Sequence, residues 1–130
     1  PVRFGAEFRL HVLDGTIVTA SLYAVDGDLE IAPLDEHPDG PVVLAFAASL
    51  LDEATSTLPS AVVVDVGMAV VSGASAAVPV VIEANAAWAS GHYAGEPEAV
   101  LDTVLRAAGP VQEVSARDAG FLRAAAAVEA

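Results

Sequence analysis

A chain of 130 residues with 55% hydrophobic side chains can bury the core of one domain, and we expect a single domain over residues 1–130. Its 18 acidic and 5 basic residues give a formal charge of −13, which repels phosphate backbones and argues against nucleic acid as a partner. No apolar run approaches the roughly 20 residues that cross a bilayer, so we expect no membrane partner. The absence of cysteine fits a cytoplasmic protein, and five arginines without a lysine indicate a GC-rich bacterial genome.

The first expected element is a β-hairpin. Residues 7–13 and 16–23 alternate between apolar and polar side chains, as half-buried strands do. Asp14-Gly15 between them is typical of a two-residue type I′ turn, because both positions of that turn need a positive φ. A turn of fixed length sets which residues of the two strands face each other.

This turn predicts that Arg9 lies opposite Ala20 and His11 opposite Val18. Arg9 then lies on a face that is apolar enough to make an unpaired guanidinium costly. The other face carries apolar side chains from both strands: Phe8, Leu10, Val12 and Ile17.

The middle of the chain predicts a turn, a loop and a helix. Residues 25–28 are typical of a turn, and residues 33–40 of a polar loop. Pro41 is a favourable first helical residue, and the apolar side chains after it recur at helical spacing. We expect a helix from about 41 to 57, ended by residues 58–60.

Two β-branched runs follow, residues 61–71 and 78–85, with a flexible connection between them. Both runs are apolar almost throughout, so we expect central strands that are covered on both faces. A loop of small residues at 86–95 comes next.

Two helices are expected near the C-terminus. The first begins at Pro97 and ends at Gly109-Pro110, with Val100, Leu101, Val104 and Leu105 on one apolar face. Ser115 with Asp118 three residues later can cap a last helix that carries Phe121, Leu122 and Ala125. The elements together predict an α+β domain with a largely antiparallel sheet flanked by helices.

Three oxygen-bearing side chains suggest a metal site. Glu83 and Asn85 are two residues apart in a strand, so both point to one face, and Asp65 on a neighbouring antiparallel strand can meet them there. A polar side chain in an otherwise apolar strand is costly unless it is paired. Such oxygen donors suit Mg²⁺, or Mn²⁺ in its place. Two simpler interpretations stay open: Asp65 as a turn residue before Gly67, and Glu83 as a charge on an edge strand.

The Asp strand, the Glu-x-Asn strand and the small-residue loop after them resemble the C-terminal lobe of the ATP-grasp carboxylate-amine ligases. Residues 7–23 and 85–91 are similar to poorly characterised bacterial members of this superfamily, so the resemblance covers most of residues 5–108. It implies that Asp65, Glu83 and Asn85 hold Mg²⁺ ions that bridge the phosphates of ATP. It also implies that Arg9 is a catalytic residue that contacts phosphate.

The resemblance places the substrate near the loop, which gives four candidate residues: His11, Trp88, Ser90 and Gly91. For three residues another interpretation stays open. Arg9 pairs with Glu7 or Asp65, His11 is a half-buried and hydrogen-bonded histidine, or Trp88 anchors the core beneath the loop.

The function implied by the resemblance is an ATP- and Mg²⁺-dependent ligase that forms an amide through an acyl phosphate. Small carboxylate and amine substrates would be its partners. The lysines that this superfamily uses come largely from the earlier lobe, and the chain has none, so we expect an N-terminal lobe that is missing here, or a homodimer partner. The isolated chain is then expected to be inactive. The alternative is a non-catalytic module that binds nucleotide, metal or protein.

Overall fold

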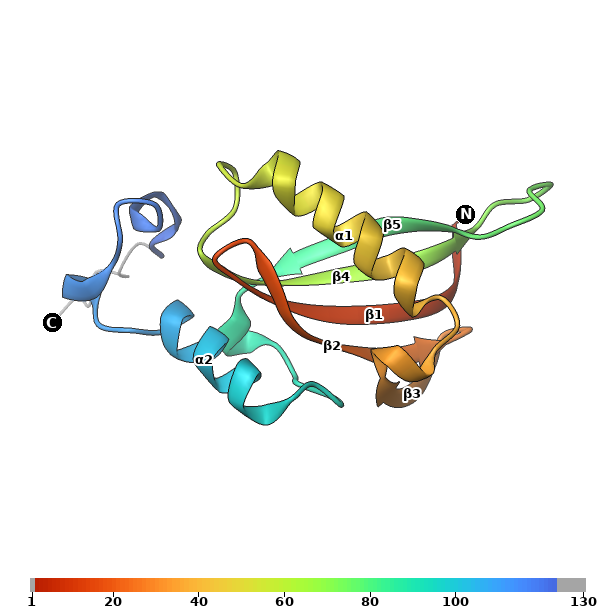
Figure 1. The fold of residues 1–130 in the computed structure, drawn as a ribbon, viewed down its shortest axis with the longest axis horizontal. Helices are drawn as coiled ribbons and strands as arrows, with labels where there is room; N and C mark the ends of the chain where they lie inside the picture. Colours follow the sequence, from red (N-terminus) through yellow and green to blue (C-terminus); the bar gives the residue numbers. More distant parts are fainter. Residues whose placement is uncertain (1, 124–130) are drawn as a thin grey trace, which may run out of the picture.

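The computed structural model describes residues 2–123, and over this range the chain folds into an antiparallel five-stranded sheet with the order β3-β2-β1-β4-β5 (Figure 1). The strands are β1 (Arg3–Leu13), β2 (Thr16–Val25), β3 (Asp28–Pro33), β4 (Ala61–Val70) and β5 (Val78–Asn85). The helices are α1 (Gly40–Ala54) and α2 (Pro97–Ala107), with 3₁₀ turns at Leu34–Glu36, Ala87–Ala89, Val111–Glu113 and Ala119–Phe121. The predicted α+β class with a largely antiparallel sheet is confirmed.

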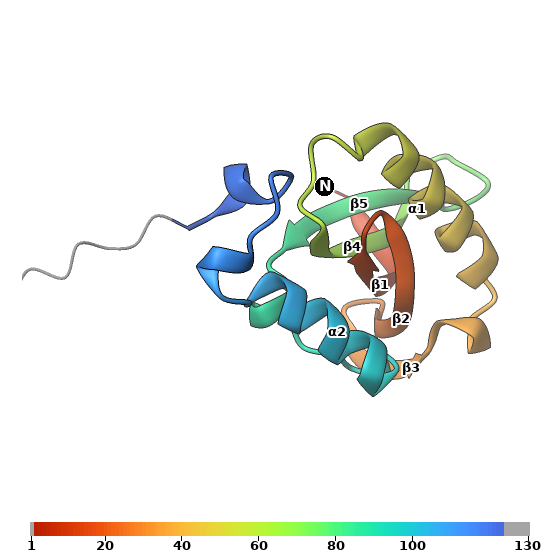
Figure 2. The ribbon, with the colours of Figure 1, turned by 60° about the vertical axis from the view of Figure 1, so that its left-hand side comes forward.

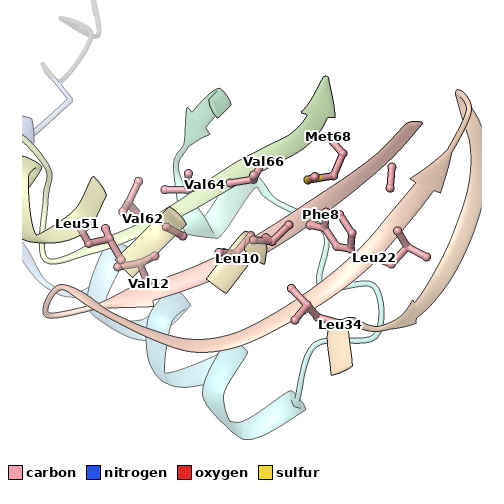
Figure 3. Packing of buried hydrophobic residues seen from close by; sticks show 13 residues of the cluster. Phe8, Leu10, Val12, Leu22, Leu34, Leu51, Val62, Val64, Val66 and Met68 are labelled. Atoms are coloured by element: carbon pink, nitrogen blue, oxygen red, sulfur yellow. The ribbon is translucent and has the colours of Figure 1, made fainter. Parts of the chain in front are cut away.

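The sheet lies between the two helices, with α1 on one face and α2 with the preceding loop on the other (Figure 2). The face under α1 forms the apolar core, in which Phe8, Leu10 and Val12 of β1 are fully buried (Figure 3). Helix α1 adds Val43 and Leu51 to this cluster. Burial of this continuous apolar layer is the main source of stability, and it leaves the second face for polar side chains.

The hairpin turn is confirmed, because Asp14 and Gly15 have φ of +50° and +77°, as a type I′ turn requires. The predicted register is wrong beyond the first residue pairs. A β-bulge at Val18 shifts the strands, so that Arg9 lies opposite Ser21 and His11 opposite Thr19. The neighbours of Arg9 on β2 are therefore polar residues and not the expected apolar ones.

Strand β3 was not expected, since residues 28–33 carry few of the signals of a buried strand and lie at the edge of the sheet. Strand β4 is central and buried, as predicted. Strand β5 is the opposite edge strand, and the prediction that it is covered on both faces is wrong. Its apolar sequence reflects one covered face and a terminal position in the sheet.

The helices also differ from expectation in detail. Helix α1 ends at Ala54, three residues before the predicted end. In α2 the predicted apolar face is wrong in part, since Leu101 and Leu105 are 54% and 61% exposed while Thr103 is buried. The hydroxyl of Thr103 donates to the carbonyl of Ala99, which satisfies it inside the helix.

The last predicted helix is a 3₁₀ turn in the described part of the chain. Asp118 donates its backbone N–H to Ser115 Oγ at 3.2 Å, so the predicted cap exists. Its carboxylate, however, accepts from Ser60 and Ser115, and only the short turn Ala119–Phe121 follows. Ala125 lies outside the described residues.

The side chains on the face of the sheet opposite α1 depend on a glycine. A Cβ added to Gly67 in β4 would lie 2.5 Å from Phe4 Cδ1 and 3.0 Å from Ile82 Cδ1. At Gly5 the nearest atom to an added Cβ is Val70 Cγ2, at an ordinary 3.6 Å.

We therefore expect Gly67→Ala to lower the free energy of unfolding by about 1–3 kcal/mol, because Phe4 and Ile82 must move. Urea unfolding at neutral pH measures this. Gly5→Ala is the matched control in the same sheet and should change the free energy by less than about 0.5 kcal/mol. Equal effects of the two substitutions would contradict the packing argument.

Candidate functional site

The centre of the polar face is an ion pair between neighbouring strands. Arg9 of β1 and Asp65 of β4 lie opposite each other in the register. Arg9 Nε donates to Asp65 Oδ1 at 2.9 Å, and Nη2 donates to Oδ2 at 2.7 Å. The two side chains are only 11% and 2% exposed, so water competes little for this bidentate contact. The interpretation that Arg9 pairs with Asp65 is confirmed, and Glu7 is not its partner.

Aromatic rings hold the other side of the guanidinium. Arg9 Cζ lies 5.0 Å from the ring centre of Tyr93 and 5.5 Å from that of Tyr23. The two rings stack at 5.1 Å with an interplanar angle of 14°. These cation–π contacts and the carboxylate fix the plane of the guanidinium. The hydrogen bond to Asp65 raises the pKa of Arg9 although burial opposes it, so the charge is permanent.

Tyr23 connects this cluster to Glu7, because its hydroxyl donates to Glu7 Oε2 at 2.9 Å. Burial first, and then this hydrogen bond, raise the pKa of Tyr23, so its hydroxyl keeps its proton. The sequence analysis did not single out Tyr23. The signal that could have found it is its even spacing from Thr19 and Ser21 in β2, which places all three on the face of Arg9.

The loop between β5 and α2 is tied down over this face. Ala94 N–H donates to Ser21 Oγ at 3.0 Å, and Glu96 N–H donates to Thr19 Oγ1 at 2.8 Å. Tyr93 itself has a φ of +49°, a left-handed conformation that is unfavourable for a side chain of this size. The contacts of its ring with Arg9 and Tyr23 offset this cost and hold the loop in place.

The three predicted metal ligands share one face of the sheet. Asp65 and Glu83 are cross-strand neighbours in β4 and β5, and Asn85 follows two residues later, opposite Val63. Asp65 is buried, Asn85 is half-buried and Glu83 is exposed on the edge strand. The argument that Glu83 needs a partner because it interrupts a buried strand is therefore wrong.

The chemistry of these residues fits a cation that is held jointly with a ligand. Among residues 2–123, no three His, Cys, Asp or Glu side chains gather closely enough to hold a metal ion by themselves. Magnesium binds through one or two carboxylates and fills its remaining positions with water and phosphate oxygens. The carboxylates of Asp65 and Glu83 with the amide oxygen of Asn85 meet that need. Arg9 already uses one lone pair on each oxygen of Asp65. Metal binding here stays a prediction.

The predicted substrate residues occupy different environments. His11 is 1% exposed, so the interpretation as a half-buried, hydrogen-bonded histidine is wrong; in the described part of the chain its Nε2 has no hydrogen-bond partner. Trp88 is 53% exposed, so the interpretation as a core anchor is also wrong. Ser90 Oγ donates to the carbonyl of Ala86, and the Gly91 carbonyl accepts from Arg9 Nη1 at 3.4 Å.

The comparisons with known proteins agree with this fold and this arrangement. A family model of the ATP-grasp domain matches residues 1–103, so the chain is an ATP-grasp protein. The matching model describes the second family of one clade within that superfamily, and the chain belongs to this family. No curated protein and no solved structure matches the chain. Membership of the superfamily indicates an ATP-dependent, ligase-type function with ATP and Mg²⁺ as the typical ligands of the family. In the part of the chain that the structure covers, no helix is long and apolar enough to span a membrane.

The buried ion pair should show a strong asymmetry on mutation. We expect Arg9→Met to lower the free energy of unfolding by about 3 kcal/mol, because it leaves the Asp65 carboxylate buried without a partner. The double variant Arg9→Met/Asp65→Leu should recover most of that loss. Urea unfolding measures both.

Arg3→Met is the control for the ion pair, since Arg3 and Asp26 form an exposed salt bridge with a comparable distance of 2.6 Å. Its loss should change stability little. If the double variant were as unstable as Arg9→Met, the buried charge would not be the cause.

His11 should make stability depend on pH. Burial, and then the charge of Arg9, lower the pKa of His11 below its ordinary value of 6.5. The unfolded chain therefore binds a proton near that pH while the folded chain does not. Stability due to this residue is complete above pH 6.5 and falls on acidification, by up to about 1.4 kcal/mol per pH unit until the folded pKa is reached.

Urea unfolding between neutral pH and pH 5 in the presence of a chelator tests this. His11→Leu should flatten the pH dependence, while His92→Gln, which replaces an exposed histidine, should keep most of it. An unchanged slope in His11→Leu would show that other groups cause it.

Proposed function

We propose that this chain is the lobe of an ATP-dependent ligase that activates a carboxylate as an acyl phosphate and transfers the acyl group to an amine. The observation that carries the proposal is the cross-strand pair Asp65 and Glu83, with Asn85 two residues further along the same face. Family membership supports it, because ATP-grasp domains have ligase-type functions.

The metal in this proposal is Mg²⁺ or Mn²⁺, held by Asp65, Glu83 and Asn85 together with phosphate oxygens. When bound, the cation neutralises charge on the phosphates of ATP, which phosphoryl transfer requires. An acidic protein with a formal charge of −13 needs such help to bind a polyanion.

In this proposal Arg9 acts on Asp65 first. Its two short hydrogen bonds keep the carboxylate ionised and fix its direction on a buried strand. The guanidinium carries more N–H donors than its contacts with Asp65 and Gly91 use, so a phosphate oxygen could be a further acceptor. Glu83, exposed on the edge strand, is the ligand that an incoming nucleotide reaches from solvent.

The proposed chemistry has two steps. A carboxylate oxygen of the substrate attacks the γ-phosphorus of ATP, the bond to the bridging oxygen breaks, and ADP leaves with an acyl phosphate formed. The nitrogen of an amine then attacks the carbonyl carbon, loses a proton and releases phosphate. Neither step needs a nucleophilic side chain, because phosphoryl transfer depends mainly on positioning and charge stabilisation.

A lobe that covers the nucleotide belongs to the same proposal. It would come from another part of the protein or from a second copy of the chain, and it would bring the lysines that this sequence lacks. Comparing the intact mass of the protein from its source organism with the 13.1 kDa of this chain separates these two cases.

A second candidate is a non-catalytic module, which one observation favours. Both oxygens of Asp65 already accept hydrogen bonds from Arg9, as a structural ion pair requires. In that case Mg²⁺ and ATP at millimolar concentration would leave the melting temperature unchanged, whereas a useful site would raise it.

We expect Glu83→Gln to weaken the binding of Mg·ATP by about tenfold or more, since one carboxylate ligand is lost. Stability should change little because Glu83 is exposed. Isothermal titration calorimetry with the protein as its organism produces it measures the affinity.

Glu30→Gln is the matched control, because it removes an exposed carboxylate from the edge strand β3 at the other side of the sheet. The ligase proposal fails if Glu83→Gln and Glu30→Gln bind Mg·ATP as tightly as the unchanged protein.

A further inference from the structure

A cavity of about 970 Å³ lies at the end of the sheet where the β1–β2 turn is found. The ends of β4 and β5 form one side of it, and the end of α2 with residues 109–122 forms the other. Its volume is at the upper end of the roughly 300–1,000 Å³ of small-molecule sites. The wall formed by residues 109–122 lies beyond residues 1–103, the part that the family match covers.

The outer wall of the cavity is fixed to the domain by polar contacts. The Asp118 carboxylate accepts from the backbone N–H of Ser60 at 2.6 Å and from its hydroxyl at 2.5 Å. Arg117 Nε donates to the carbonyl of Leu58 at 3.4 Å. Burial alone would raise the pKa of Asp118, but the hydrogen bonds from Ser60 and Ser115 outweigh it and lower the pKa. The wall is therefore held at neutral pH.

The lining combines apolar surface with an exposed aromatic ring. Trp88 and Phe121 line the cavity, and both remain about half exposed in the structure. Leu105 and Val111 add further exposed apolar surface to the same wall. Large apolar side chains left in contact with water around a cavity favour a ligand with an apolar body.

The charges of the lining favour a cation. Three carboxylates line the cavity, from Asp102, Glu113 and Asp118, against one guanidinium, from Arg106. Arg106 Nη1 already donates to Asp14 at 2.8 Å, and Asp118 is occupied by Ser60. Within residues 2–123, Asp102 and Glu113 form no salt bridge. Tryptophan is also the side chain that attracts cations best through its ring face.

We propose that this cavity binds a small organic amine with an apolar body. The ammonium group is recognised by Asp102, Glu113 and the ring of Trp88, and the apolar part by Leu105 and Phe121. Asn85 lines the same cavity and also belongs to the proposed metal site, so the bound amine would lie near the phosphates. Its role as the acceptor of the acyl group rests on the proposed function, whereas its binding does not.

The test uses three probes of equal shape and different charge: 2-phenylethylamine, 2-phenylethanol and phenylacetate. Trp88 is the single tryptophan of the chain, so its indole N–H resonance reports on the cavity directly. We expect the amine to shift this resonance at millimolar concentration and to bind at least about tenfold more tightly than the alcohol, with phenylacetate weaker still.

Variants identify the groups that select the charge. Asp102→Asn and Glu113→Gln should each weaken amine binding several-fold and leave binding of the alcohol unchanged. Glu98→Gln is the matched control, since Glu98 is an exposed carboxylate of the same helix that does not line the cavity. Circular dichroism confirms that each variant folds.

Three results would overturn the proposal. The first is equal affinity for the amine and the alcohol, and the second is the same affinity loss in Asp102→Asn and Glu98→Gln. The third is an unshifted Trp88 resonance at the highest amine concentration. Because the amine is titrated without nucleotide, these failures leave the ATP site untouched. Loss of Mg·ATP binding in Glu83→Gln is in turn measured without amine.

Discussion

The paired charges of Arg9 and Asp65 are the constraint around which the polar half of this domain is organised. Two oppositely charged side chains on adjacent central strands are almost completely buried, at a distance of 2.7 Å. Burial of this kind is tolerated only when both partners are present and their remaining groups are satisfied. Tyr23, Tyr93 and the Gly91 carbonyl complete the surroundings of Arg9, and so the loop from β5 to α2 is placed by the same charge.

This arrangement joins stability to the proposed function through shared residues. Asp65 is needed for the ion pair and is also a proposed ligand, while Glu83 beside it is exposed and contributes little to the fold. A site with one rigid, buried carboxylate and one accessible carboxylate is suited to receive a cation that arrives with a phosphate ligand. His11 lies next to Arg9 on the same strand face and is kept neutral by burial and by that charge.

The second structural theme is the C-terminal segment, which forms a wall and not a helix. Asp118 serves as a clamp on Ser60 in the loop before β4, which fixes residues 115–118 against the hairpin end of the sheet. Packing of this segment leaves a cavity of about 970 Å³ in place of a filled core. Apolar side chains on α2 that the helical pattern directs inward, Leu101 and Leu105, remain exposed for the same reason.

The sequence by itself determined the local features and the side-chain chemistry of this protein. The Asp14-Gly15 turn, the α+β class, strand β4, and Asp65, Glu83 and Asn85 on one face follow from turn chemistry and from alternation along strands, which are local properties. Only the tertiary structure decided the bulge at Val18, the edge positions of β3 and β5, the partner of Arg9 and the cavity beside Trp88. These depend on which strands and segments lie side by side, and contacts between residues distant in the chain leave no periodic signal in the sequence.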